Sequence, residues 1–200
     1  MKLAIHQPEH FPYDGFFQKM SSVDVFVILD DVKFKKNDFQ NRNRFTNFSN
    51  EFEWFGFPVS KKSNSQIIHD VVPLNDEEHN WKNKVVRKLE MNLKADPDEM
   101  FQIYSHDSLI KINMASIEWC RKKLGITTPI IFSSEIEKIG SKSDLLLQIS
   151  QKLGATTYVS GQGGKNYLDV EIFKESNIKV EFFEPIIENY NSALQNILRK

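Results

Sequence analysis

The chain has 200 residues and a mass of 23.4 kDa, which suits one domain or one domain with a sizeable insertion. Its net charge of −1 argues against non-specific nucleic-acid binding, which needs surplus Lys and Arg to neutralise phosphates. The single cysteine, Cys120, excludes an internal disulfide and a multi-cysteine zinc site, and its helical setting favours a buried structural thiol. With no signal-like leader and no apolar run near the ~20 residues of a membrane span, we expect a cytoplasmic protein without a membrane partner.

The N-terminal elements are predicted to be a strand, a short helix and a second strand. The apolar run KLAI at residues 2–5 ends at the turn-forming HQPEHFP, so it predicts a strand. Phe16, Phe17 and Met20 lie at helical spacing. The continuous apolar run DVFVIL at residues 24–29 is typical of a strand that is buried on both faces. Together these elements begin a parallel βαβ unit.

The central region, at about residues 32–125, differs in composition. Its first part is polar, aromatic and rich in asparagine, and it can form a hairpin around NEFEWFGFPVS. The segments NWKNKVVRKLEMNL and HDSLIKINMASIEWCRKKLG are predicted helices. We interpret this region as an inserted α+β lobe rather than a linker, because its apolar residues are periodic.

The last third again alternates strands and helices. Strands are predicted at residues 129–134, 156–161 and 178–184, and helices at 141–154 and 166–177. We therefore predict a doubly wound α/β fold with a mainly parallel sheet, similar in element order to nucleotidyltransferase (HUP-like) folds. Its sheet core would come from about residues 1–31 and 126–185, within one domain spanning 1–200.

Polar segments follow several predicted strands at the point where each strand ends. His6 and His10 follow the first strand, Asp30 and Asp31 follow the second, and residues 160–165 follow a later one. Ligands of parallel sheets bind at the carboxyl ends of the strands, so we expect these segments to converge. Chance convergence is the alternative, because loops are polar in any case.

The histidines favour general acid–base chemistry, because imidazole titrates near neutral pH. His6 or His10 can act as the base, with Asp30 or Asp31 orienting it. The alternative is a histidine at the edge of the core that bonds to the backbone. No metal is expected, because Pro8 argues against one helical face for both histidines and no third ligand is evident.

Two further segments can bind anions. The run SGQGGK can present backbone N–H groups to an anion beside Lys165, although it lacks the spacing of a P-loop and a simple tight turn explains it equally well. Arg42 and Arg44 lie two residues apart, so on a strand both guanidinium groups point to one face, where they suit carboxylates or phosphates. A solvated strand face is the alternative for this pair.

The motifs HQPEHFPYDGFF, DVFVILDDVKF and DFQNRNR together resemble the WbqC-like family. The segments WFGFPVS, LGITTPIIFSSEI and GATTYVSGQGGKNYLD extend this resemblance over nearly the whole chain. Lys33 stands where the family usually has glutamine, and the tail ENYNSALQNILRK lacks an expected serine–aspartate segment. The resemblance implies a role in bacterial surface-polysaccharide biosynthesis, such as that of the O-antigen of lipopolysaccharide.

The resemblance also implies an activity, that of a transferase. Such an enzyme attaches an aminoacyl or acyl group to the amino group of a nucleotide-linked deoxyamino sugar. The donor would be acyl-CoA, a carrier-bound acyl group or an aminoacyl-tRNA. The alternatives are a non-catalytic protein of the same pathway that binds the nucleotide sugar or acts as a scaffold, and an ATP-dependent ligase. No sequence-specific nucleic-acid binding is expected, and a homodimer is left open.

A second resemblance concerns the first helix. The succession of strand, QPEHFPYDGFF and VFVILDD is similar to the opening of class I aminoacyl-tRNA synthetases and related nucleotidyltransferases. Those proteins carry His-x-Gly-His, where this chain has Tyr13, Asp14, Gly15 and Phe16. Both catalytic histidines are therefore missing, and ATP chemistry is not implied. Gly15 would still allow a ligand to approach the helix closely.

The predicted site combines these four segments of the chain. In the transferase hypothesis the base is His6 or His10, the loop glycines supply N–H donors, and Arg42 holds a diphosphate. The predicted catalytic residues are His6, His10, Asp30 and Asp31. The predicted substrate-binding residues are Gln7, Gly15, Gln40, Asn41, Arg42, Arg44, Ser160, Gly161, Gly163, Gly164, Lys165 and Tyr167.

Overall fold

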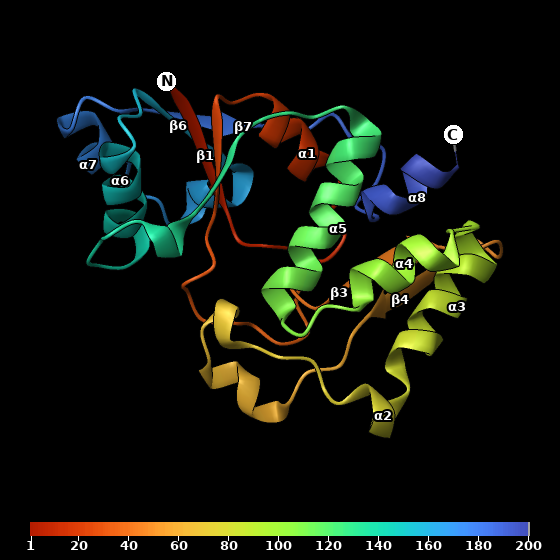
Figure 1. The fold of residues 1–200 in the computed structure, drawn as a ribbon. Coiled ribbons are helices and arrows are strands. Elements are labelled where there is room, and N and C mark those ends of the chain that lie inside the picture. Colours follow the sequence, from red (N-terminus) through yellow and green to blue (C-terminus); the bar gives the residue numbers. More distant parts are fainter. Residues whose placement is uncertain (200) are drawn as a thin grey trace. The chain divides into compact units, whose positions relative to one another are not determined.

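The computed structural model describes residues 1–199, which divide into two compact units (Figure 1). Unit 1 consists of residues 1–7, 15–29 and 126–187, and unit 2 consists of residues 8–14, 30–125 and 188 onward. Each unit is thus assembled from separate stretches of the chain. The organisation as one domain with an inserted lobe stays a prediction.

Unit 1 is built on a parallel sheet of five strands. The strands are β1 (Lys2–His6), β2 (Val25–Ile28), β5 (Ile130–Phe132), β6 (Thr157–Gly161) and β7 (Lys179–Phe183). They lie in the order β5-β2-β1-β6-β7, and all four pairings are parallel. Counted along the chain this is the order 3-2-1-4-5 of doubly wound sheets, with the reversal between β1 and β6. The predicted mixed α/β architecture with a mainly parallel sheet is confirmed.

The helices of unit 1 are α1 (Asp14–Ser21), α6 (Lys142–Lys152) and α7 (Val170–Glu175). Phe16, Phe17 and Met20 are buried on α1, as their spacing predicts. Gly154 has a φ of +69° just after α6, a conformation that favours glycine at a helix end. The Asp169 carboxylate accepts from the Glu171 N–H at 3.1 Å and so caps the start of α7.

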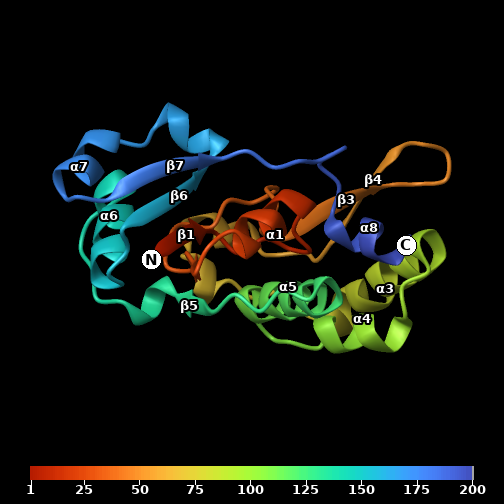
Figure 2. The same cartoon turned by 90° about the horizontal axis from the view of Figure 1, so that it is seen from above.

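Unit 2 contains a hairpin and a set of helices. Its hairpin consists of β3 (Arg42–Thr46) and β4 (Phe52–Gly56); β4 lies within the segment predicted to form a hairpin, residues 50–60, whereas β3 precedes that segment. Its helices are α2 (Asp76–His79), α3 (Trp81–Leu93), α4 (Pro97–Tyr104), α5 (Leu109–Leu124) and α8 (Ala193–Leu198). Helix α4 packs against both α3 and α5 (Figure 2).

The two helices predicted for the central region are confirmed as α3 and α5, whereas α4 and α8 were not predicted. Cys120 is fully buried in α5, and burial raises the pKa of its thiol, as expected for a structural residue. Within residues 1–199, no helix combines the length and apolar character that crossing a bilayer requires.

Candidate functional site

His6 is the last residue of β1, at the carboxyl edge of the unit 1 sheet. Its ring packs edge to face against Phe16 with centroids 4.9 Å apart, and it lies nearly parallel to Phe26 at 6.5 Å. The Nδ1 atom lies 3.0 Å from the carbonyl oxygen of Gln7. A carbonyl oxygen only accepts, so this contact assigns the proton of the neutral ring to Nδ1. The lone pair that can take a proton is therefore on Nε2.

The surroundings of His6 keep its ring neutral. Burial and, to a smaller extent, the positive charge of Lys19 together lower the pKa of His6 to about 3, against a still smaller opposing effect of the Gln7 hydrogen bond. At neutral pH the imidazole is therefore uncharged. A neutral imidazole with its lone pair on Nε2 is the form required of a general base.

Lys19 of α1 is buried in unit 1 with only 4% of its surface exposed. Its Nζ atom lies 5.9 Å from the ring centroid of Phe26 and 4.0 Å from the position that a Cβ would take at Gly161. Lysine is among the residues least often buried, so this ammonium group is a strong sign of a polar site. The site predicted from the sequence did not include Lys19. The available signal was its position three residues after Phe16, on the apolar face of the helix.

The glycine-rich segment follows β6 as a short 3₁₀ turn at Gln162–Asn166. A Cβ on the buried Gly164 would lie 2.1 Å from the Ser160 hydroxyl oxygen, so only glycine fits there. At Gly163, by contrast, a Cβ would meet no atom of the described chain within 4 Å. The turn thus holds one glycine for steric reasons, and the proposed anion-binding role of its N–H groups stays a prediction.

The other predicted residues of unit 1 lie around these elements. Gly15 is buried in the first turn of α1, and Gln7 is half-buried after β1. The Lys165 ammonium lies 5.6 Å from the ring centroid of Phe182, and the Tyr167 side chain is exposed. In unit 1 the structure therefore brings His6 and Gly161 into one neighbourhood, together with Lys19.

His10 lies in the aromatic core of unit 2 and is fully buried. Its Nε2 atom is 3.0 Å from the Tyr104 hydroxyl, and the rings of Phe11, Phe55 and Phe57 lie within 5.5 Å, centroid to centroid. Burial lowers the pKa of His10 to about 3. This setting is typical of a core histidine, bonded here to a side chain rather than to the backbone. Its predicted catalytic role stays a prediction.

The side-chain amides of the QNRNR segment bond to backbone groups of unit 2. Asn43 Nδ2 donates to the carbonyls of His10 at 3.1 Å and Phe11 at 2.8 Å. Asn41 Nδ2 donates to the carbonyl of Phe57 at 3.0 Å. Gln40 Oε1 accepts from the backbone N–H of Lys35 at 2.9 Å. All these amides are buried, so they hold loop backbone in place.

Arg42 and Arg44 extend from the same face of β3, as predicted. The Arg42 guanidinium lies 4.2 Å from the ring centroid of Trp54, and that of Arg44 lies 4.4 Å from the centroid of Phe52. Both aromatic residues belong to β4 and are exposed. The hairpin thus presents stacked cation–aromatic pairs on its outer face.

Asp30 and Asp31 begin the second stretch of unit 2, where Asp30 is 4% exposed and Asp31 is half-buried. The predicted residues therefore divide between the units. Unit 1 holds His6, Gln7, Gly15, Ser160, Gly161, Gly163, Gly164, Lys165 and Tyr167, and unit 2 holds His10, Asp30, Asp31, Gln40, Asn41, Arg42 and Arg44. The joint site of all four segments stays a prediction. Among residues 1–199, no group of three or more His, Cys, Asp or Glu side chains is placed to hold a metal ion.

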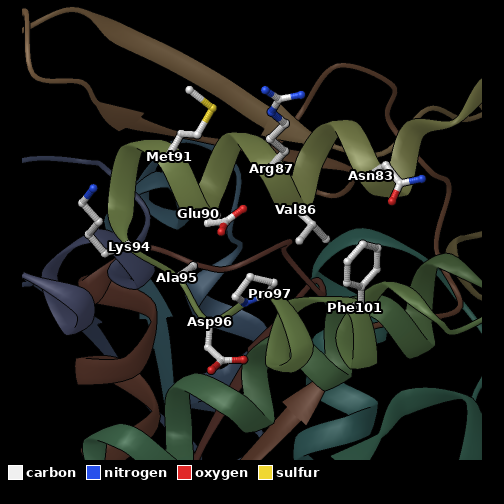
Figure 3. Close-up of a pocket in the computed structure, with 10 residues that line it drawn as sticks. All are labelled: Asn83, Val86, Arg87, Glu90, Met91, Lys94, Ala95, Asp96, Pro97 and Phe101. Atoms are coloured by element: carbon white, nitrogen blue, oxygen red, sulfur yellow. The ribbon is translucent and has the colours of Figure 1, made fainter.

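Two cavities are lined by described residues of unit 2. An open groove of about 990 Å³ runs between α3 and α4, where Val86 and Phe101 lie next to one another (Figure 3). Charges of both signs border it, among them Arg87 and Glu90. A smaller cavity of about 330 Å³ lies between the hairpin and α3, and the predicted residues Asn41 and Arg42 line it.

Comparison with known proteins supports the motif-based resemblance. The model of the WbqC-like protein family matches residues 7–196. The chain is 31% identical over 194 residues to a protein of Mycobacterium tuberculosis named uncharacterized protein Rv1507c, a match that covers 92% of this chain and 82% of that protein. No solved structure matches the chain. Since the family match spans nearly the whole sequence, the chain belongs to the WbqC-like protein family.

Proposed function

We propose that the protein is a transferase that acylates or aminoacylates the amino group of a nucleotide-linked deoxyamino sugar in bacterial surface-polysaccharide biosynthesis. The observation that carries this proposal is the neutral His6 ring, with its lone pair on Nε2, in the same buried neighbourhood as Lys19 and Gly161. Membership of the WbqC-like family supports the substrate class.

The chemistry assigned to this neighbourhood has two parts. The sugar amine attacks the carbonyl carbon of a thioester or ester donor, and His6 Nε2 takes the proton that the nitrogen loses. The carbonyl oxygen becomes an oxyanion, which the Lys19 ammonium group stabilises. When the tetrahedral intermediate collapses, the C–S or C–O bond breaks and the leaving thiolate or alkoxide takes the proton back from His6. The products are an amide and a free thiol or alcohol.

The low pKa of His6 agrees with this role once a substrate is bound. Without substrate, burial and the charge of Lys19 hold the pKa of His6 at about 3. An anionic substrate group that pairs with Lys19 would cancel part of that charge and raise the pKa of His6, although burial, the larger cause, would still hold this pKa below 6.5. The site would then gain basicity only when it is occupied.

The test is an assay of the purified protein with a nucleotide-linked amino sugar and a panel of donors, namely acyl-CoA thioesters, acyl carrier protein thioesters and aminoacyl-tRNA. Mass spectrometry should detect the amide product, without ATP. His6→Gln should lower turnover by about 10²–10⁴-fold while binding of the nucleotide sugar is retained. Binding without product from any donor would favour the non-catalytic alternative, and ATP-dependent product with phosphate release would favour the ligase. A His6→Gln variant with full turnover would refute the role of His6.

A further inference from the structure

The cavity between β4 and α3 in unit 2 combines aromatic walls with positive charge. Trp54 and Phe57 form its hairpin side, and Trp81 of α3 packs against Phe57 with ring centroids 5.9 Å apart. Arg42 lines it from β3, and Lys84 and Lys88 line it from α3. The described residues that line the cavity include these three basic side chains, of which Lys88 also pairs with the Glu53 carboxylate at 3.5 Å.

The spacing of α3 explains how one helix supplies both kinds of group. Trp81, Lys84 and Lys88 lie three and four positions apart, so they occupy one face of the helix. That face packs on β4, and the Lys88 ammonium donates to the backbone carbonyl of Trp54 at 3.1 Å. The cavity is therefore built largely from the regular elements β3, β4 and α3, which gives its side chains defined positions.

Two buried polar atoms at this cavity are left with hydrogen-bonding capacity. Arg42 Nη2 donates to the Asn37 carbonyl at 2.6 Å, but Arg42 Nε has no hydrogen-bond partner among residues 1–199. Asn41 is 7% exposed, and its Oδ1 atom likewise has none within that part of the chain. One atom is a donor and the other an acceptor, and such groups are costly to bury unless they are satisfied. A ligand that supplies both an anionic oxygen and an N–H or O–H group would satisfy them.

We infer that this cavity binds the nucleoside diphosphate part of the sugar nucleotide. The base would stack on Trp54, which is 40% exposed, the diphosphate would meet Arg42 and Lys84, and an N–H or O–H of the base or ribose would donate to Asn41 Oδ1. A volume of about 330 Å³ is that of a small-ligand site. The inference rests on the proposed function for its choice of a sugar-linked nucleotide, and it gives that nucleotide a place in unit 2.

The test is titration of the full chain with UDP by calorimetry, with uridine alone and inorganic diphosphate alone as separate probes. UDP should bind more tightly than either fragment. Trp54→Ala should weaken UDP binding by about ten- to hundredfold through lost stacking, and Trp54→Phe should restore most of it. Lys84→Glu should weaken UDP binding by about tenfold and leave uridine binding unchanged.

The matched control is Lys122→Glu, which makes the same charge change on the exposed surface of α5 outside the cavity. It should bind UDP like the wild type. Lys84 is exposed, so Lys84→Glu stays informative even if Trp54→Ala does not fold. No UDP binding by the wild type, or equal weakening by Lys84→Glu and Lys122→Glu, would overturn the inference.

The outcomes separate this inference from the proposed function. His6→Gln should bind UDP with unchanged affinity even as it loses turnover. UDP bound in the cavity of a protein without transferase activity would leave the inference standing and refute the proposed function. Product formation by a protein whose UDP affinity is unchanged by Trp54→Ala and Lys84→Glu would support the proposed function and refute the inference.

Discussion

The side-chain nitrogen of Asn43 donates a 2.8 Å hydrogen bond to the backbone carbonyl of Phe11, a buried residue whose φ is +41°. Bulky residues rarely adopt this left-handed conformation, which costs about 1–3 kcal/mol. The Ser192 hydroxyl also donates to that carbonyl at 2.7 Å, and the Phe11 N–H donates to Ser116 Oγ at 3.0 Å. Side chains from distant parts of unit 2 thus hold the strained residue in place.

Replacing this amide should destabilise the protein strongly. Asn43→Leu keeps the volume but removes the donor to the carbonyls of His10 and Phe11, both inside unit 2. We expect a loss of about 2–5 kcal/mol in the free energy of unfolding, measured by urea denaturation. Asn83→Ala, on the exposed side of α3, is the comparison and should change it by less than about 0.5 kcal/mol. Equal effects of Asn43→Leu and Asn83→Ala would show that the Asn43 hydrogen bonds do not hold Phe11 in place.

Acid should destabilise the fold through its buried histidines. The pKa of His10 is lowered from 6.5 to about 3 in the folded state, so between those values the unfolded chain binds a proton that the folded chain does not. Stability is therefore fully present above pH 6.5 and falls as the pH decreases toward 3, by about 1.4 kcal/mol per pH unit for this residue.

His10→Gln removes that titration. The difference in unfolding free energy between wild type and His10→Gln, measured by urea denaturation at a series of pH values, should be constant above pH 7, where it reports the packing of the ring and its contact with the Tyr104 hydroxyl. Below pH 6 this difference in unfolding free energy should decrease steadily as the pH falls, because only the wild type loses stability through His10. A difference that stays the same from pH 8 to pH 4 would show that the pKa of His10 is the same in the folded and the unfolded protein, contrary to this prediction.

The two loop glycines should respond differently to alanine. Gly164→Ala places a methyl group against the Ser160 hydroxyl and should cost about 1–3 kcal/mol, whereas Gly163→Ala should be nearly neutral. The double change Gly164→Ala with Ser160→Ala removes the clashing oxygen and should recover part of the loss. Thermal unfolding of the wild type, the two single variants and the double variant gives the coupling energy, and simple additivity would rule out the steric explanation.

Lys19 should control the ionisation of His6. Lys19→Met removes the charge that lowers the pKa of His6, so this pKa should rise, although burial keeps it below the ordinary value of 6.5. Lys19→Arg keeps the charge and should leave the pKa of His6 near 3. Titration of the His6 ring protons by NMR distinguishes the variants, and an unchanged value in Lys19→Met would show that the two groups do not interact.

The elements with strong local patterns could be predicted from the sequence. The strands of unit 1 are short apolar runs that end at polar segments, and α3 and α5 carry regular apolar spacing. Helix α4 was missed even though Asp96 caps it and Pro97 begins it, both signals visible in the sequence. Helix α8 has only six residues, and its buried face depends on contacts elsewhere in unit 2.

The site was less predictable, because burial depends on residues far apart in the chain. The sequence around His10 is typical of a loop, yet Tyr104 and Phe57 enclose its ring from other elements. The amides of Gln40 and Asn41 were predicted to bind substrate, which stays a prediction, and the structure shows both of them bonded to the backbone. Lys19 was missed although its spacing from Phe16 places it on the apolar face of α1, because a lysine in an amphipathic helix usually belongs to the polar face.

The position of β1 in the middle of the sheet has a consequence for synthesis on the ribosome. Its partner β2 follows at Val25–Ile28, but its other partner, β6, begins only at Thr157. Translation adds about 5–20 residues per second, so one edge of β1 remains unpaired for on the order of ten seconds until β6 has been synthesised. During that time the nascent chain carries an open, apolar strand edge, the kind of surface that invites aggregation. Strand β1 therefore leaves the ribosome long before β6 and completes its pairing late, so a chaperone that covers β1 during translation would have its greatest effect in that interval.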